Sequence, residues 1–251
     1  MPLANYRSVI DLRLAEGSDA GEGAGITGRA VTEFVGSACA GYTTTVRFVT
    51  QTTAPTGARQ VDDVRGVSFE TAGGVLEFEN EVYTDNKLVE HSAGRAATGN
   101  DGVTTVTLTE PGEKTFVLPG DIAFPTDQVV RTIAAGIAGK RFLSFGLYDG
   151  TDEGETVYGT STVIGPPSTE ADDVGVETGV ADAGFAAMRH WPVTISYFRD
   201  PDSTDMTPAY TMSLVLYENG VTRDLKLDYG VFALHGKLTT LEMLPAPDCP
   251  G

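Results

Sequence analysis

Apolar and polar residues alternate with a period of two along most of the chain. In the first segment, one face consists of Tyr6, Ser8, Ile10, Leu12 and Leu14. Successive side chains of a β-strand point to opposite sides of a sheet, so this alternation predicts a strand with one buried and one solvated face. Strand-like segments recur at residues 46–48, 76–82, 103–108, 142–148 and 157–164.

The last third of the chain predicts an antiparallel meander. Residues 210–216 alternate, and the Asn219-Gly220 pair that follows is a strong hairpin signal, because both central positions of a type I′ turn need positive φ. Two further strand-like segments follow, at 221–227 and 231–244. Earlier turn signals separate the other strands, at Gly73-Gly74, Asp85-Asn86, Asn100-Asp101-Gly102 and Asp149-Gly150. The chain is therefore expected to be all-β.

One segment, at about 126–138, keeps helical rather than strand spacing. Pro125 and Thr126 provide a start, with Thr126 as the expected N-cap, and Gly139 provides an end. We expect this short helix to plug or flank the sheet.

The chain is expected to form a single domain over residues 1–251. We find neither an internal repeat nor a composition shift that marks a boundary. Residues 165–187 are rich in Gly, Pro, Asp and Glu, which predicts a long, mobile acidic loop between two β segments.

The charge and hydropathy of the chain exclude several classes of partner. The formal net charge is −18, so phosphate backbones and anionic lipid surfaces would repel the protein, and nucleic-acid binding is disfavoured. No apolar run approaches the roughly 20 residues of a transmembrane helix, so the chain is not expected to span a membrane.

The two cysteines, Cys39 and Cys249, lie at opposite ends of the chain. They are either two unrelated free thiols or the two halves of a long-range disulfide. The bridge is favoured because it gives a reason for a cysteine in the Pro-rich tail, and it implies an oxidising compartment. No signal peptide is visible before the first strand, so we expect an export signal to have been removed.

The sequence contains no recognisable catalytic or metal-binding set, and no enzymatic activity, cofactor or metal is expected. The nearest approach to a nucleophile elbow is residues 37–41, with Cys39 in the nucleophile position, but a strand rather than a helix is expected next. The histidines are far apart and are interpreted as surface or interfacial residues: His91, His190 and His235. Residues 149–155 are interpreted as an acidic hairpin loop, with weak calcium binding as the alternative.

Three residues are candidates for a binding role. Trp191, the only Trp, can serve as a ligand platform or as a core anchor, and the core is the favoured reading. Arg223 and Asp224, just after the Asn-Gly turn, can form a cross-strand pair or a local polar network.

Several tracts taken together resemble the cell envelope integrity protein EipB family of exported bacterial proteins. They are Ser37–Tyr42, Leu147–Gly154, Trp191–Val193, and above all Leu216–Leu225 with Leu227–Gly230. The resemblance covers the chain from Tyr6 to Cys249. The acidity of this chain and its 165–187 loop are the main departures.

The resemblance implies a periplasmic protein of a Gram-negative bacterium with its signal cleaved. It also implies a many-stranded antiparallel sheet coiled into a spiral or unclosed barrel with one small helix, and a disulfide between Cys39 and Cys249. The leading hypothesis is a non-enzymatic binding or scaffold protein that supports envelope integrity, with another periplasmic protein or an envelope component as partner. The alternatives are a carrier of a lipid or other apolar ligand and, least favoured, a Cys-dependent hydrolase.

Overall fold

Period-two alternation produces one continuous, strongly curved β-sheet. The structure, a computed structural model, describes residues 2–18, 25–169, 180, 184–185, 187–199, 207–247 and 249. Within these residues, fifteen strands join into a single sheet. All neighbouring strands are antiparallel except β9 and β10, which are parallel. The elements are β1 (Asn5–Leu14), β2 (Gly25–Ser37), β3 (Gly41–Thr53), β4 (Arg59–Thr71), β5 (Val75–Thr84), β6 (Lys87–Thr98), β7 (Thr104–Glu110), β8 (Lys114–Leu118), β9 (Ile122–Ala123), α1 (Pro125–Ile137), β10 (Phe142–Leu147), the 3₁₀ turn η1 (Asp152–Gly154), β11 (Tyr158–Ile164), β12 (His190–Phe198), β13 (Tyr210–Tyr217), β14 (Thr222–Asp228) and β15 (Ala233–Leu244).

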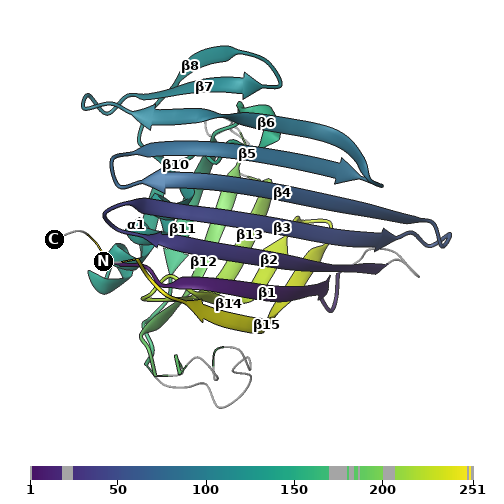
Figure 1. The fold of residues 1–251 in the computed structure, drawn as a ribbon. Coiled ribbons are helices and arrows are strands. Elements are labelled where there is room, and N and C mark those ends of the chain that lie inside the picture. The colour runs from purple at the N-terminus through teal and green to yellow at the C-terminus, as the bar shows by residue number, and fades with distance from the viewer. Residues whose placement is uncertain are drawn as a thin grey trace.

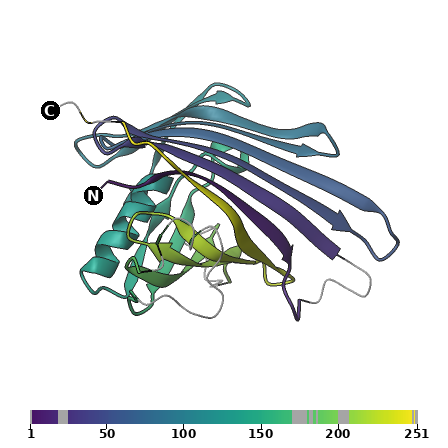
Figure 2. The ribbon, with the colours of Figure 1, turned by 60° about the horizontal axis from the view of Figure 1, so that its bottom comes forward.

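The sheet consists of two meanders joined through the first and last strands. The strand order runs from β8 back to β1, then from β15 back to β9. The β1–β15 pair holds both ends of the chain in the middle of the sheet, with Tyr6 opposite Met243. The long strands of the first meander form one layer, the shorter strands of the second form the other, and α1 lies at one end (Figures 1 and 2). The expected all-β fold, a coiled and nearly closed barrel-like sheet, is confirmed.

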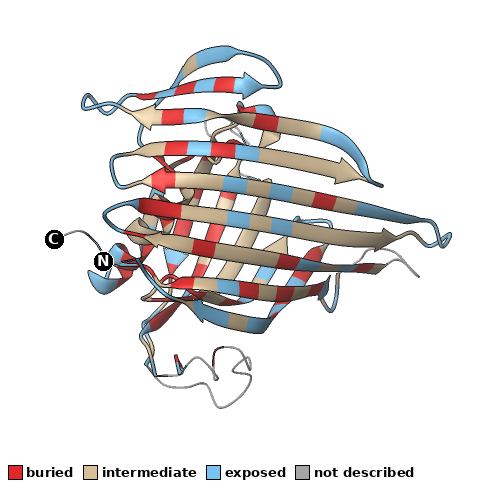
Figure 3. Ribbon diagram, in the orientation of Figure 1, coloured by how far each residue is buried: buried red, intermediate tan, exposed pale blue. Residues whose placement is uncertain are grey.

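The core lies between the two layers. Figure 3 shows buried and exposed positions alternating along the long strands, as the sequence pattern predicts. The largest fully buried side chains are aromatic, and they include Trp191, Tyr148, Tyr197 and Tyr217. Burying such large apolar groups is the main favourable contribution to folding.

Helix α1 is where the sequence places it, but its N-terminus is capped differently. The helix spans Pro125–Ile137, and Gly139 follows with φ 73°, which confirms the predicted C-terminal end. The prediction that Thr126 is the N-cap is wrong. Pro125 occupies the first turn, so Phe124 is the N-cap residue, and its side chain makes no capping hydrogen bond.

Two predicted hairpin turns differ in geometry. Asp85 and Asn86 both have positive φ, as a two-residue turn requires. At the second hairpin Gly220 has φ 90° but Asn219 does not adopt positive φ, so the expected type I′ turn is wrong there. The Tyr217 N–H donates to the Val221 carbonyl, which makes a three-residue loop with glycine at its last position.

The predicted acidic loop is described only in part. Residues 170–179, 181–183 and 186 lie outside the described residues. Val180 and Phe185, within the same segment, are buried against the cluster that contains Leu12 and Tyr217. The single-domain assignment and the mobility of this loop stay predictions.

No helix within the described part of the chain combines the length and the hydropathy that crossing a bilayer requires.

Candidate functional site

A cleft of about 460 Å³ lies where the hairpin turns of the first meander face helix α1. Its walls come from the β2–β3 turn, the β4–β5 turn, the β6–β7 loop, strand β9 and the first two turns of α1. Apolar groups such as Ile122, Phe124 and Val130 line it beside three carboxylates and one guanidinium: Glu70, Asp121, Asp127 and Arg131. This volume lies within the usual range for small-ligand sites, which combine apolar walls with a few placed polar groups.

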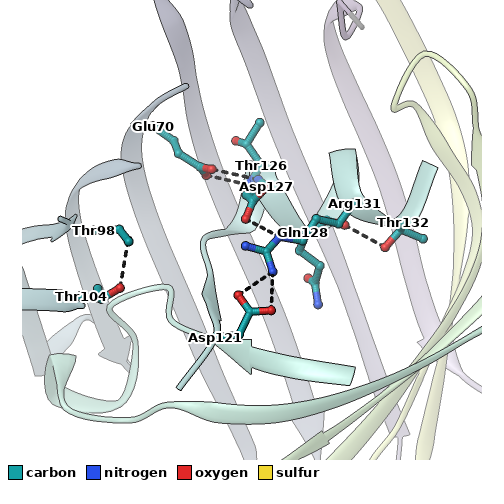
Figure 4. A network of polar contacts seen from close by, with 9 residues as sticks. All are labelled: Glu70, Thr98, Thr104, Asp121, Thr126, Asp127, Gln128, Arg131 and Thr132. Carbon is teal, nitrogen blue, oxygen red and sulfur yellow. Dashed lines mark hydrogen bonds and ion pairs between the residues drawn. The ribbon is translucent and has the colours of Figure 1, made fainter. Parts of the chain in front are cut away.

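Glu70, at the end of β4, caps helix α1 from across the cleft. Its carboxylate accepts hydrogen bonds from the backbone N–H groups of Thr126, at 2.7 Å, and Asp127, at 2.8 Å (Figure 4). These are donors of the first helical turn, which have no partner inside the helix. Burial raises the pKa of Glu70 to about 7, even though both hydrogen bonds favour the charged form.

Arg131 is held between two carboxylates on the same side of the cleft. Its Nη1 lies 2.8 Å from Asp121 Oδ1, and its Nε lies 2.7 Å from Asp127 Oδ2, one helical turn earlier (Figure 4). The guanidinium also stacks over Phe145, with 5.2 Å to the ring centroid. Burial raises the pKa of Asp127, and this outweighs the opposing effect of Arg131. Asp121, Asp127 and Arg131 are therefore paired with one another, whereas Glu70 is paired with the helix N-terminus.

The disulfide ties the C-terminal tail to the rim of this cleft. Cys39 is bonded to Cys249, across a sequence separation of 210 residues. Cys39 belongs to the β2–β3 turn; Ala38 of this turn and the flanking strand ends Ser37 and Gly41 line the cleft. The disulfide that the sequence favours is present, and it leaves Cys39 without a thiolate in this oxidised form.

Trp191 occupies the core and not an exposed platform. Its side chain is 1% exposed, and it packs against the face of α1 at Gly136. An added Cβ at Gly136 would come within 2.8 Å of the Trp191 ring, so a glycine permits this close approach. This burial favours the core-anchor reading; a binding role for Trp191 stays a prediction.

Arg223 and Asp224 are neighbours in sequence but point to different environments. Arg223 is buried, and its Nε donates to the Tyr217 hydroxyl at 3.0 Å. Asp224 lies at the surface, with its Oδ1 3.0 Å from His235 Nε2. The structure therefore does not bring Trp191, Arg223 and Asp224 together in the cleft, and their role in binding stays a prediction.

The three histidines differ in burial, which the sequence does not indicate. His190 is 4% exposed and contacts the Tyr217 ring, so its assignment to the surface is wrong. His235 is exposed, as expected. His91 lies on the outer face of the sheet beside Glu79.

The acidic loop between β10 and β11 folds onto β6. Ser92 Oγ donates to the Gly150 carbonyl at 2.6 Å, and the Tyr148 hydroxyl donates to the Gly154 carbonyl at 2.7 Å. The carboxylate of Asp149 accepts hydrogen bonds from Thr151, two residues on. These contacts hold the loop in place against β6 and favour the structural interpretation of the loop; weak calcium binding stays a prediction.

Comparison with known proteins agrees with this architecture. The EipB-like family profile matches residues 1–245. This chain belongs to the EipB-like family. The cell envelope integrity protein EipB of Brucella abortus (strain 2308) is 38% identical to this EipB-like chain over 242 residues, which cover 96% of this chain and 84% of that protein.

A solved structure extends the comparison to the fold. It is a crystal structure from Brucella abortus, described as a β-barrel-like protein of a domain of unknown function. It matches this EipB-like chain with a TM-score of 0.86 and 37% sequence identity, over 97% of this chain and 99% of that one. The family resemblance read from the sequence is confirmed.

The cleft of this EipB-like protein was not identified from its sequence. Glu70 is one glutamate in an ordinary strand pattern, and Asp121 precedes a strand of two residues. The one available signal was the Pro125-Thr126-Asp127 helix start, which marks one wall. Nothing in the sequence places the hairpin turns of the first meander against that wall.

Proposed function

We propose that this protein is a periplasmic, non-enzymatic binding or scaffold protein that supports envelope integrity, and that the cleft beside α1 is its binding site. The observation that carries the proposal is the arrangement of charged groups in the cleft. The Glu70 carboxylate accepts hydrogen bonds from the N-terminus of α1, and the Arg131 guanidinium forms ion pairs with Asp121 and Asp127. Such a site offers shape and polarity rather than an activated nucleophile with its base.

Family membership supports the envelope role, since the Brucella relative is named for cell envelope integrity. The disulfide between Cys39 and Cys249 supports an oxidising compartment such as the periplasm. A Cys-dependent hydrolase is the least supported alternative, because Cys39 is committed to that bond.

Obstruction of the cleft tests the proposal. Ala72, exposed in the β4–β5 turn, lines the cleft, so Ala72→Trp should block it with little effect on folding. Ala58→Trp is a matched control, because Ala58 is an exposed alanine in the β3–β4 loop at the other end of β4. Each variant would be expressed in a strain lacking the gene, and detergent resistance measured.

We expect Ala58→Trp to restore resistance and Ala72→Trp to fail, with equal amounts of both proteins in the periplasmic fraction. Full restoration by Ala72→Trp would overturn the role of the cleft. Recovery of the folded protein in the cytoplasmic fraction alone would overturn the periplasmic assignment.

A carrier of a lipid or other apolar ligand is the second candidate. The observation in its favour is a set of inward-facing side chains that pack against the core while only half-buried: Phe48, Met212, Leu214, Leu225 and Leu227. Native mass spectrometry of protein from periplasm, without reductant, distinguishes the two candidates. A bound lipid mass would favour the carrier, and an adduct-free chain would count against it.

A further inference from the structure

The register of β5 and β6 brings together three side chains that carry metal-ligand atoms. His91 on β6 lies directly opposite Glu81 on β5, and Glu79 lies two residues before Glu81 on the same face. This is the outer face of the sheet, because Phe78, which precedes Glu79 in the strand, and Leu76, of the same parity, point into the core. One ligand atom from each of the three residues lies within 4.8 Å of the other two.

The spacing of the ligand atoms suits a metal ion. His91 Nε2 lies 3.3 Å from Glu79 Oε1. Zinc bonds to histidine nitrogen and carboxylate oxygen are about 2.0–2.1 Å long, so two donors of a tetrahedral zinc are about 3.3–3.4 Å apart. The His91–Glu79 pair already has this separation, and a rotation of the half-buried Glu81 side chain brings in the third ligand.

Charge and rigidity also favour a cation here. With a neutral imidazole the three side chains carry two negative charges, which a divalent ion would neutralise. The neighbouring guanidinium groups each have a carboxylate partner outside the site, since Arg65 Nη2 lies 2.8 Å from Asp63 and Arg95 Nε lies 3.8 Å from Glu77. Arg65 also lies opposite Glu81 and attracts it electrostatically, so it offsets part of the negative charge of the site. Both strands continue on either side of the site, so the sheet fixes the backbone positions of the ligands.

We propose that Glu79, Glu81 and His91 form a surface site for Zn²⁺ or a related late first-row divalent ion. An imidazole nitrogen among the donors favours these ions over Mg²⁺ and Ca²⁺, which take oxygen ligands. Three protein ligands leave a fourth position for water or for a donor group of another molecule. The site lies on the outer face of the sheet, and none of its residues lines the cleft beside α1.

Imidazole NMR spectra recorded during a titration with zinc sulfate test the site directly. The protein would carry no histidine tag, and its three histidines report separately. We expect the ring nitrogen signals of His91 to shift and saturate at one equivalent. His235 is a matched internal control, because within the described part of the chain its Nε2 forms an ion pair with one carboxylate, that of Asp224, at 3.0 Å. Its signals and those of the buried His190 should not change at that point.

The zinc affinity of variants, measured by calorimetry with zinc sulfate, is then compared with that of the unmodified protein. Loss of an outer-shell partner already weakens metal binding by about 10- to 100-fold, so His91→Ala should weaken it by at least about tenfold. Glu79→Gln combined with Glu81→Gln should do the same, and His235→Ala should bind as the unmodified protein does. Equal affinity of His91→Ala and the unmodified protein, or parallel shifts of His91 and His235, would overturn the proposal.

Discussion

The Glu70 carboxylate takes the place of the N-cap side chain that helix α1 lacks, by accepting the Thr126 N–H at 2.7 Å. The two residues are 56 positions apart in the sequence. One side chain of the first meander thus holds the end of a helix that borders the second. The contact also forms one wall of the cleft, so the stability of the helix and the shape of the cleft depend on the same carboxylate.

Removal of the cap should destabilise the protein. Glu70→Ala at pH 4.5, where the contribution of Glu70 to stability is present, leaves the Thr126 and Asp127 N–H groups without their acceptor. We expect a loss of about 1–2 kcal/mol in the free energy of unfolding, as for other helix caps. Urea denaturation measures it. A stability equal to that of the unmodified protein would contradict the capping role.

The raised pKa of Glu70 predicts a pH dependence. The value is about 7 in the folded protein, against an ordinary 4.5. A carboxyl group whose pKa is raised by folding contributes stability that is complete below about pH 4.5 and is lost as the pH rises through about 7. This shift corresponds to a contribution on the order of 3 kcal/mol.

The unfolding free energy of the unmodified protein should therefore fall relative to that of Glu70→Gln as the pH rises from 4.5 to 7. Glu70→Gln is the reference because its side chain does not titrate. Parallel curves for the two proteins would contradict the raised pKa of Glu70.

Asp63 should show the opposite pH dependence. Its carboxylate accepts hydrogen bonds from Arg47, at 2.9 Å and 3.0 Å, and from Arg65, and these arginines lower its pKa to about 2. A carboxyl group with a lowered pKa contributes stability that is present above pH 3.8 and is lost as the pH falls through about 2.

Asp63→Asn should cost about 1 kcal/mol at pH 7, a modest effect because both arginines are largely solvated. Denaturant titrations at pH 7 and at pH 2 measure the difference between the two proteins, which should shrink at pH 2. A difference of the same size at both pH values would show that the ion pairs do not cause it.

Loss of the disulfide should lower stability without removing a chemical activity. The bond closes a loop of 210 residues, for which chain entropy gives up to about 5 kcal/mol. Cys39→Ser with Cys249→Ser should reduce the melting temperature. Reduction of the unmodified protein should have the same effect, and the double variant should not respond to reductant. An unchanged melting temperature after reduction would refute a structural role for the bond.

Gly136→Ala should destabilise the protein, although alanine normally stabilises a helix by about 1 kcal/mol relative to glycine. The added Cβ would lie 2.8 Å from the Trp191 ring. Overpacking of this kind lowers the free energy of unfolding by about 1–3 kcal/mol. Thermal melting measures it, with Gly112→Ala as the control because a Cβ there meets open space. A melting temperature above that of the unmodified protein would refute the tight Trp191 contact.

The strands and the helix could be predicted from the sequence because their signals are local. Alternation along the segment around Leu76 and Phe78 reports which side of its own strand is buried, and the structure agrees. Gly139 ends α1 as expected, because a left-handed residue after a helix favours glycine. The Asn219-Gly220 turn shows where prediction from local signals fails, because an Asn-Gly pair fits both a two-residue and a three-residue hairpin loop.

The sequence by itself determined the all-β class, the position of α1, the candidate disulfide and the family. The tertiary structure alone decided that Glu70 caps α1, that His190 is buried, and that Glu79, Glu81 and His91 lie within reach of one ion. The physical reason is the distance along the sequence over which each kind of interaction acts. Alternation, turn preferences and helix ends depend on neighbours a few residues away, whereas the cleft and the proposed metal site depend on strand register and on how the sheet coils. Those are set by the packing of the whole core.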